Sequence, residues 1–337
     1  MAQSYQPLSK TKRKNTSTLK QISVVIPLYN EEESLPELIE WISRVMSEHD
    51  FDYEVVMGDD GSSDGSWQVI QSLAERHPIK ALKFNRNYGK SAALNVGFKH
   101  TEGEVVITMD ADMQDSPDEI PELYRMIKGG HHLVSGWKKK RHDPISKTLP
   151  SKFFNRVTRM LSGIKLHDFN CGLKAYDQRV VKSLEIYGEM HRYIPVIAKR
   201  NGFLKIGEKV VEHRARKYGT TKFGLERFIY GFLDLISISF VSRYKKRPMH
   251  FFGTLGTLSF LIGFLFVGWL GWVKIRAIYI LKTDDYRQIV DQPVFFLALA
   301  AIIIGVQLFL AGFIGEMMTM NSHKRSDYLL EETIGID

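Results

Sequence analysis

Two aspartates one residue apart, in the segment Asp110-Ala111-Asp112, are the side chains of this sequence best suited to bind a divalent metal ion. They directly follow a short apolar run, so a buried strand would deliver both carboxylates to one edge of a sheet. Mg²⁺ and Mn²⁺ prefer such hard oxygen ligands and keep coordination positions open for phosphate oxygens. A bound ion would neutralise a diphosphate leaving group. By itself, the pair is also typical of a solvated acidic turn before Pro117.

Three further polar loops follow apolar runs in the same way. Asp59 and Asp60 could accept hydrogen bonds from a base or a ribose, although a turn with a helix cap explains them as well. Lys90 opens a helical segment, where a cation opposes the helix dipole and where an anion would bind. The segment after the first apolar run could form the floor of a nucleotide pocket, and its candidate residues are Pro27, Tyr29, Asn30 and Glu32.

These loops need a scaffold that brings them together, and the first 140 residues supply one. Apolar runs alternate with helical patterns, which indicates an α/β fold with a mostly parallel sheet covered on both faces. The carboxyl ends of parallel strands share one edge, where ligands bind in open α/β sheets. The expected strands are 22–27, 53–57, 80–84, 105–109 and 132–136, and the expected helices are 34–48, 66–76, 90–99 and 117–127.

Taken together, the motifs in these loops resemble those of the inverting glycosyltransferases of family 2, which have a GT-A nucleotide-binding fold. The matching segments read P-x-Y-N-E-E, D-D-G-S-x-D, N-x-G-K-x-x-A-L-N and D-A-D-x-Q-D. Within that family, the chain is similar to the polyprenyl-phosphate glycosyltransferases, including dolichyl-phosphate mannose synthases and the GtrB-type bacterial enzymes. The segments that carry this closer similarity are 136–144, 168–174, 188–192 and 216–222.

The resemblance implies specific roles. The donor would be a nucleotide-sugar, UDP-linked by similarity to the bacterial members, carrying glucose or a related hexose, and the acceptor would be a polyprenyl phosphate of undecaprenyl or dolichyl type. Asp168 and Asp112 would be catalytic. Asp110, Asp112 and Gln114 would hold Mg²⁺ or Mn²⁺, although an amide is a weak ligand. The nucleotide would contact Pro27, Tyr29, Asn30, Glu32, Asp59, Asp60, Lys90, Asp110 and Ala111.

A phosphate acceptor changes what the reaction requires. The second ionisation of a phosphate monoester falls near pH 6, so the acceptor is mostly a dianion at neutral pH and needs no base. We therefore expect Asp168 to orient the acceptor or the sugar. We also expect cations that hold two anions together, because arginine suits bidentate phosphate contacts. The candidate cations are Lys138, Arg141, Arg192, Arg214, Arg216 and Lys222.

The C-terminal part of the sequence predicts a membrane anchor. Segments 249–273 and 293–315 contain no Asp, Glu, Lys or Arg, and each is long enough to cross a hydrocarbon core as a helix. Residues 1–20 are basic and lack the apolar core of a signal peptide. Basic residues flank the spans at 243–247 and 323–325, so the positive-inside rule places the catalytic domain and both termini in the cytoplasm. The similarity to bacterial members favours the bacterial inner membrane.

The net charge of +8 gathers beside this anchor, with 11 Lys or Arg against 4 Asp or Glu in 205–247. That distribution favours membrane lipid and phosphate as partners over nucleic acid. The single cysteine, Cys171, excludes a disulfide within one chain and a cysteine-based zinc site. The chain is expected to divide into a flexible basic tail at 1–20, a GT-A domain at 21–222, an interfacial amphipathic helix with a basic juxtamembrane segment at 223–248, two transmembrane helices at 249–273 and 293–318, and a cytoplasmic tail at 319–337.

Three other functions are compatible with parts of the sequence to different degrees. A processive polysaccharide synthase would need more spans and an R-W pair, which the sequence lacks. A tethered family 2 transferase with a non-lipid glycan acceptor and a non-catalytic lipid-binding scaffold stay open. An organic-soluble product would exclude the first, and metal-dependent binding of a nucleotide-sugar would exclude the second. A homo-oligomer also stays open, because the spans could pack against copies of themselves through Gly253, Gly256, Gly263 and Gly268.

Overall fold

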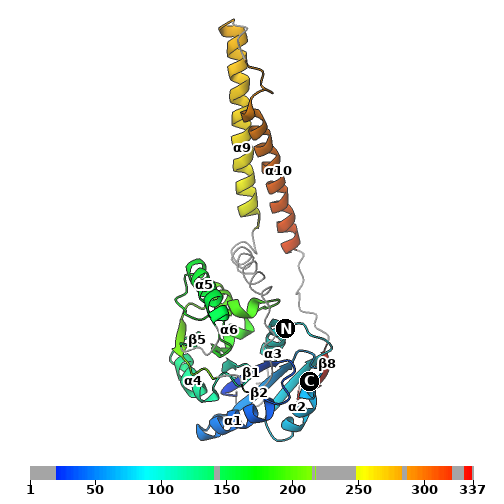
Figure 1. Ribbon diagram of the computed structural model, residues 1–337, viewed down its shortest axis with the longest axis vertical. Helices are drawn as coiled ribbons and strands as arrows, with labels where there is room; N and C mark the ends of the chain where they lie inside the picture. Colours follow the sequence, from blue (N-terminus) through cyan, green and yellow to red (C-terminus); the bar gives the residue numbers. More distant parts are fainter. Residues whose placement is uncertain are drawn as a thin grey trace, which may run out of the picture. The chain divides into compact units, whose positions relative to one another are not determined.

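The structure is a computed structural model that describes residues 20–139, 145–214, 217, 248–282, 287–320 and 330–335. The chain separates into two compact units, one formed by Met1–Leu235 with Tyr328–Asp337 and the other by Ile236–Asp327. The first unit contains the α/β sheet, and the second contains the two long apolar helices (Figure 1). The expected N-terminal tail lies outside the described residues except for Lys20, and the expected interfacial helix lies outside them except for Pro248.

The first unit is built on an eight-stranded sheet with the strand order β7-β5-β6-β4-β1-β2-β3-β8. Its centre is parallel and consists of β1 (Ile22–Leu28), β2 (Tyr53–Asp59), β3 (Ile79–Phe84) and β4 (Val105–Thr108). All five strands expected from the sequence are present. The structure adds β6 (Lys174–Asp177), which lies antiparallel between β4 and β5 (Leu133–Trp137), and β7 (Ile206–Val210), which is parallel to β5.

Helices cover both faces of this sheet, as the sequence predicts. All seven residues of β1 are buried, which is typical of a strand covered on both sides. Val24 and Ile26 join one core with helices α1, α2 and α4, whereas Val25 joins a second core with α3, α6 and α7. The helices are α1 (Leu35–Glu48), α2 (Ser66–Ala74), α3 (Lys90–Lys99), α4 (Ile120–Lys128), α5 (Ile145–Ser162), α6 (Gln178–Lys182) and α7 (Ile194–Arg200), with short 3₁₀ helices η1 (Pro117–Glu119) and η2 (Met190–Tyr193).

The last strand, β8 (Leu330–Ile334), comes from the end of the chain and pairs antiparallel with β3 (Figure 1). The indole nitrogen of Trp67 on α2 donates a hydrogen bond of 2.5 Å to the carboxylate of Glu332 on β8. The interpretation of 319–337 as a tail is therefore corrected, because residues 330–334 belong to the sheet. A five-residue run with two glutamates carries little strand signal of its own, and the unpaired edge of β3 supplies the hydrogen-bond partners that order it.

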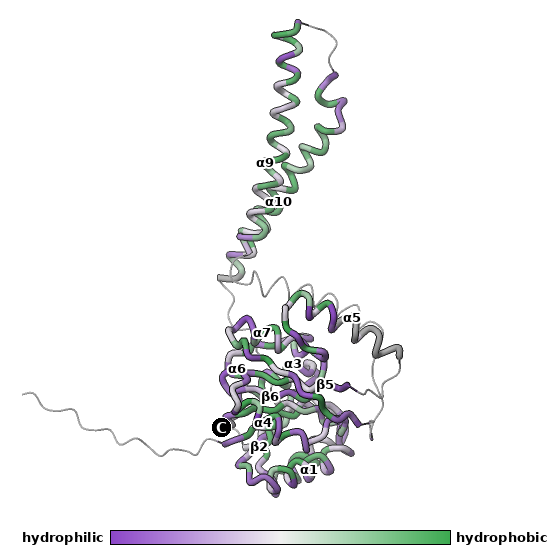
Figure 2. Tube along the Cα trace, turned by 90° about the vertical axis from the view of Figure 1, so that its left-hand side faces the viewer, coloured by the Kyte–Doolittle hydropathy of each residue, from purple (hydrophilic) through white to green (hydrophobic). Residues whose placement is uncertain are grey.

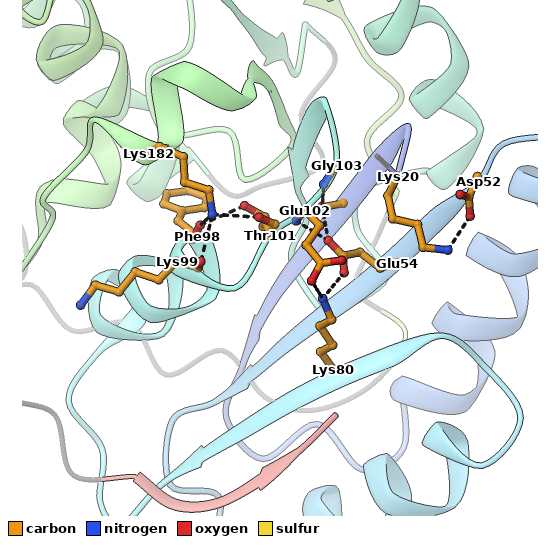
Figure 3. A network of polar contacts seen from close by, with 11 residues as sticks. Lys20, Asp52, Glu54, Lys80, Phe98, Lys99, Thr101, Glu102, Gly103 and Lys182 are labelled. Atoms are coloured by element: carbon orange, nitrogen blue, oxygen red, sulfur yellow. Dashed lines mark hydrogen bonds and ion pairs between the residues drawn. The ribbon is translucent and has the colours of Figure 1, made fainter. Parts of the chain in front are cut away.

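A network of polar contacts fixes the amino ends of the strands (Figure 3). The buried carboxylate of Glu54 on β2 accepts hydrogen bonds from the hydroxyl of Ser23 (2.5 Å) and the backbone N–H of Glu102 (2.6 Å), and it pairs with Lys80 (2.8 Å). The ammonium group of Lys182 closes the C-terminal end of α3. It donates at 2.8–2.9 Å to the backbone carbonyls of Phe98, Lys99 and Thr101. The network thereby anchors the helix that begins with Lys90.

The second unit contains a hairpin of two helices that are long and apolar enough to cross a membrane (Figure 2). The first, α9 (Pro248–Ile275), continues into a π-helical turn, η3 (Arg276–Ile280), and the second is α10 (Pro293–Met320). Glu316 on α10 accepts a hydrogen bond of 3.2 Å from the backbone N–H of Met249. This contact satisfies one of the unpaired N–H groups in the first turn of α9.

Glycines let the two helices of the hairpin approach closely. A Cβ atom at Gly256 would lie 2.6 Å from the carbonyl oxygen of Gly305, and one at Gly263 would lie 2.5 Å from the carbonyl oxygen of Ala298. The expected packing against copies of the chain is therefore corrected for Gly256 and Gly263, which pack within one chain. A Cβ at Gly268 would meet nothing within 4 Å.

Candidate active site

The loops after β1 and β2 are joined by hydrogen bonds at the carboxyl edge of the sheet. Asn30, at a positive φ of 55°, donates its backbone N–H to the Ser62 hydroxyl (2.9 Å), and its side-chain oxygen accepts the N–H of Ser63 (2.9 Å). Glu32 accepts the N–H of Gly65, the residue before α2, at 2.6 Å. Asn30 and Glu32, two of the predicted nucleotide contacts, therefore connect the two loops to each other. Of the other two predicted contacts in the segment 27–32, Tyr29 is 38% exposed and Pro27 is buried.

The two aspartates at the carboxyl end of β2, Asp59 and Asp60, have different hydrogen-bond partners. Asp59 accepts the N–H of Ser62 at 2.8 Å, and burial raises the pKa of its carboxyl. Asp60 accepts the N–H groups of Tyr88 (2.7 Å) and Gly89 (2.8 Å), the two residues before α3. Burial also raises the pKa of Asp60, to about 6. Asp60 thus sets the position of the loop that leads into Lys90.

A pocket opens beside Asp110, and three cationic side chains line it: Lys90, Lys174 and Arg192. Lys90 forms an ion pair with the Asp110 carboxylate. Burial alone would raise the pKa of Asp110, but the ammonium groups of Lys90 and Lys138 outweigh it and lower that pKa. The remaining lining residues are Pro27, Leu94, Thr108, Asn170, Cys171, Gly172, Tyr176, His191 and Ile194.

Lys174 was not predicted as a site residue. It stands in β6, is 3% exposed, and donates a hydrogen bond to the carbonyl oxygen of Cys171. Burial lowers the pKa of its ammonium group, since a charge is costly there. A lysine among the apolar residues of a strand is rare enough to have marked this position. The neighbouring thiol of Cys171 is also buried, which raises its pKa to about 12.

Gly172 is required by the position of the Asp110 carboxylate. A Cβ atom at Gly172 would lie 2.4–2.7 Å from the three carboxylate atoms of Asp110, closer than real contacts allow. The segment 168–174 and the Asp-x-Asp loop are therefore in direct contact. The pocket depends on this contact, because both Gly172 and Asp110 form its wall.

The rest of the Asp-x-Asp loop is tightly folded. Asp112 accepts the N–H of Gln114 at 3.2 Å, Ala111 is buried, and Met113 between them has a positive φ of 63°. Within the described ranges, no three His, Cys, Asp or Glu side chains gather as a metal site. Mg²⁺ and Mn²⁺ are often held by one or two carboxylates with substrate phosphates. Asp110 and Asp112 fit such a metal only together with the phosphates of a donor.

The six predicted phosphate-binding cations do not share one place. Arg192 lines the pocket and pairs with Glu189 at 3.0 Å. Lys138 instead pairs at 2.8 Å with the fully buried carboxylate of Asp115. Burial alone would lower the pKa of Lys138, but the Asp115 charge raises it overall, as in a structural ion pair. Lys138 is absent from the pocket lining, and the other three candidates, Arg141, Arg216 and Lys222, lie outside the described residues.

Arg214, the sixth candidate, contributes to the site through its backbone. Its N–H donates to the carbonyl oxygen of Gln114 at 3.0 Å, which holds the segment after β7 against the Asp-x-Asp loop. Its guanidinium lies 4.3 Å above the ring of Trp41 on α1. That side chain is absent from the lining of the pocket at Asp110.

Asp168 is buried, with 1% of its surface exposed. One oxygen of its carboxylate accepts the N–H of Asn170 at 3.0 Å, and its own N–H donates to Glu208 on β7 at 3.0 Å. Asn170 lines the pocket, whereas Asp168 is absent from the lining and contacts it through the hydrogen bond from the Asn170 N–H. Sequence reasoning placed Asp168 in the site but missed Gly172 and Lys174, which belong to the same segment, and Glu208, which contacts that segment from β7.

Known proteins resemble this chain over most of its length. Residues 23–184 match the family model described as glycosyl transferase family 2. The chain is 32% identical over 309 residues to dodecaprenyl-phosphate galacturonate synthase of Rhizobium johnstonii, which covers 90% of this chain and 89% of that protein. It is 35% identical over 264 residues to undecaprenyl-phosphate 4-deoxy-4-formamido-L-arabinose transferase of Pseudomonas syringae. That alignment covers 77% of this chain and 76% of the relative.

A solved structure shares the fold. Glucosyl-3-phosphoglycerate synthase from Mycobacterium tuberculosis, in complex with Mn²⁺, UDP and glucosyl-3-phosphoglycerate, aligns with a TM-score of 0.51 at 20% identity, over 66% of this chain and 80% of that one. The resemblance drawn from the motifs is thereby confirmed, as are the GT-A fold and the assignment as an enzyme. The chain belongs to glycosyl transferase family 2 and, within it, to the enzymes that transfer sugars to polyprenyl phosphates.

Proposed function

We propose that this enzyme moves a sugar from a UDP-linked donor onto the phosphate of an undecaprenyl- or dolichyl-type lipid, with inversion, at the cytoplasmic face of the membrane. The observation that carries the proposal is the pocket that Lys90, Lys174 and Arg192 line together with the carboxylate residue Asp110, which pairs with Lys90. Donor and acceptor are both phosphate anions, and three cations at one pocket are what bringing them together requires.

In this reaction an oxygen of the acceptor phosphate attacks the anomeric carbon of the sugar. The bond from that carbon to the diphosphate breaks, and the nucleoside diphosphate leaves with the electron pair. The acceptor is already mostly a dianion at neutral pH, so no proton has to be removed. Lys90, Lys174 and Arg192 would bind the phosphoryl oxygens. Asp168, buried and hydrogen-bonded by the Asn170 N–H, would orient the reactants and would not act as a base.

Asp110 and Asp112 would hold Mg²⁺ or Mn²⁺ together with the donor diphosphate, with the Gln114 side chain as a weaker ligand. The ion, when bound, supplies positive charge to the diphosphate as it leaves. The mycobacterial synthase with the same fold was solved with Mn²⁺ and UDP, which supports this choice of cofactor and nucleotide. Calorimetry would test it: a UDP-sugar should bind more tightly with Mn²⁺ or Mg²⁺ than with EDTA. Equal binding in both conditions would exclude the metal.

Glucose or a related hexose was expected from the sequence. Two relatives carry galacturonate and 4-deoxy-4-formamido-L-arabinose in their names, so an oxidised hexose and a modified pentose join the candidates. The full chain in lipid nanodiscs with undecaprenyl phosphate should be offered radiolabelled UDP-glucose, UDP-galacturonate and UDP-4-deoxy-4-formamido-L-arabinose in turn, each with Mg²⁺ or Mn²⁺.

One donor is expected to give a labelled product that enters organic solvent and is released by mild acid. Label transferred only to a water-soluble glycan would support the tethered transferase with a non-lipid acceptor. No transfer from these or from GDP-linked sugars, despite metal-dependent nucleotide binding, would overturn the proposal.

The sheet supports a topology with both ends of the helical hairpin on the side of the catalytic unit. The chain enters α9 after the strands β1–β7 and returns after α10 to pair β8 with β3. The flanking basic residues favour the cytoplasm for that side. The only native cysteine is buried, so a cysteine introduced at Gln288 can report on the loop between the spans. A membrane-impermeant maleimide should label it in intact cells; labelling only after lysis would reverse the topology.

A further inference from the structure

Glu208 on β7 holds the backbone that leads into Asp168. One of its carboxylate oxygens accepts two consecutive backbone N–H groups, that of His167 at 2.6 Å and that of Asp168 at 3.0 Å. The other oxygen lies 2.6 Å from Nδ1 of the His167 ring. That ring is stacked on Trp137 of β5, with 4.1 Å between centroids and 14° between planes. The Glu208 carboxylate thus contacts both His167 and Asp168, and both of its oxygens take part.

The opposite side of the Asp168 backbone is held from the neighbouring strand. The hydroxyl of Ser135 on β5 donates to the carbonyl oxygen of Asp168 at 3.2 Å. Ser135 and Glu208 are direct partners in the register of the parallel strands β5 and β7. Side chains at paired positions extend from the same face of a sheet. Two neighbouring strands therefore bind the N–H and the C=O of the same residue.

We propose that Ser135 and Glu208 form a clamp that positions Asp168 for the reaction, with Glu208 as the principal positioning residue. The inference rests on the proposed role of Asp168 in orienting the reactants. The clamp fixes the backbone on both sides of the Asp168 side chain, and the N–H of Asn170 fixes the carboxylate itself. Displacement of a reacting or orienting group by 1 Å costs about 100-fold in rate. Glu208 therefore affects the reaction only by positioning Asp168.

A double-mutant cycle tests this dependence. The full chain in nanodiscs carries Glu208→Ala, Asp168→Asn or both, and kcat and KM for the UDP-sugar are measured with undecaprenyl phosphate. Glu208→Ala alone is expected to lower kcat about 10- to 100-fold with KM changed by less than about threefold. In the Asp168→Asn background the same substitution should lower kcat by less than about twofold, because the group that it positions is already lost.

Two further variants separate positioning from folding. Glu208→Gln keeps an oxygen that can accept the Asp168 N–H, so its kcat should lie between those of wild type and Glu208→Ala. If Glu208→Ala does not fold, Glu208→Gln takes its place in the cycle. Glu54→Gln is the matched control, since Glu54 also accepts a backbone N–H at 2.6 Å and pairs with a cation, but at the amino end of the strands. It should lower the melting temperature and leave kcat per folded molecule unchanged.

Equal fold-losses from Glu208→Ala in both backgrounds would overturn the clamp, because Glu208 would then act independently of Asp168. Full activity of Asp168→Asn would overturn it as well, together with the orienting role of Asp168. In both cases the wild-type chain would still make a lipid-linked sugar. Failure of the proposed function differs from either result, because the wild-type chain itself would then make no such product.

Discussion

Lysines and carboxylates meet at both ends of the parallel strands, and the two ends use them differently. At the amino end, the contacts of Glu54, Lys80 and Lys182 close loops and a helix terminus, and none of the three lines the pocket (Figure 3). At the carboxyl end, Lys90 and Lys174 line the pocket beside Asp110. The same residue types therefore stabilise the fold at one end and, at the other, line the pocket in which we propose that phosphate binds.

Two tightly packed glycines, one at each end of the strands, differ in what surrounds them. A Cβ at Gly103, at the amino end, would lie 2.5 Å from the backbone nitrogen of Ser23, whereas a Cβ at Gly172, at the carboxyl end, would meet the side chain of Asp110. Backbone cannot move without cost to the fold, but a side chain in a pocket can. Alanine at the two positions should thus damage different properties of the enzyme.

The largest effect is expected from Gly172→Ala. The new methyl group would displace the Asp110 carboxylate, and kcat/KM for sugar transfer should fall about 100-fold while the melting temperature stays within a few degrees of wild type. Gly103→Ala is the counterpart and should cost about 1–3 kcal/mol of unfolding free energy with kcat/KM per folded molecule unchanged. Thermal unfolding and steady-state kinetics of both variants measure these two effects. Full activity of Gly172→Ala would contradict the expected difference between the two ends of the strands.

A smaller effect is expected from replacing a lysine at each end by methionine. Lys174→Met removes a cation from the pocket and should lower kcat/KM at least about tenfold, because a hydrogen bond to a charged group contributes about 1.5–3 kcal/mol. Lys182→Met leaves three carbonyl groups of the α3 terminus without their donor and should reduce stability by about 1–3 kcal/mol. If Lys182→Met instead lost activity at unchanged stability, the division between the two ends would fail.

The smallest effect concerns pH. Burial raises the pKa of Asp60 to about 6, above its value in the unfolded chain, so its contribution to stability is present at low pH and is lost as pH rises through 6. Wild type should therefore gain stability relative to Asp60→Asn when pH falls from 7.5 to 5, by about 1–3 °C in melting temperature. Differential scanning fluorimetry of both proteins at the two pH values measures this difference in melting temperature. A constant difference would mean that Asp60 does not titrate in this range.

The alternation of strands and helices in residues 22–137 is predictable from the amino-acid pattern alone. Each strand is a short apolar run, and helices such as α1 and α4 carry a 3.6-residue apolar period, so both patterns are local. The rule that parallel strands share a carboxyl edge then placed Asp59, Asp110 and Lys90 together without any coordinates. The two apolar helices were equally evident, because crossing a hydrocarbon layer requires a length and a composition that no partner has to supply.

The contacts between residues far apart in the sequence, which complete the candidate site, are visible only in the folded chain. Gly172 meets Asp110, Glu208 holds Asp168, and Lys174 lines the pocket because β6 inserts antiparallel between β4 and β5. β8 joins the sheet through contacts such as the one between Trp67 and Glu332, which are 265 positions apart. The periodicity of a segment predicts its secondary structure but does not predict which other segment will pair with it. Strand partners are chosen by burial and hydrogen-bond satisfaction over the whole domain, so these neighbours follow from the assembled sheet.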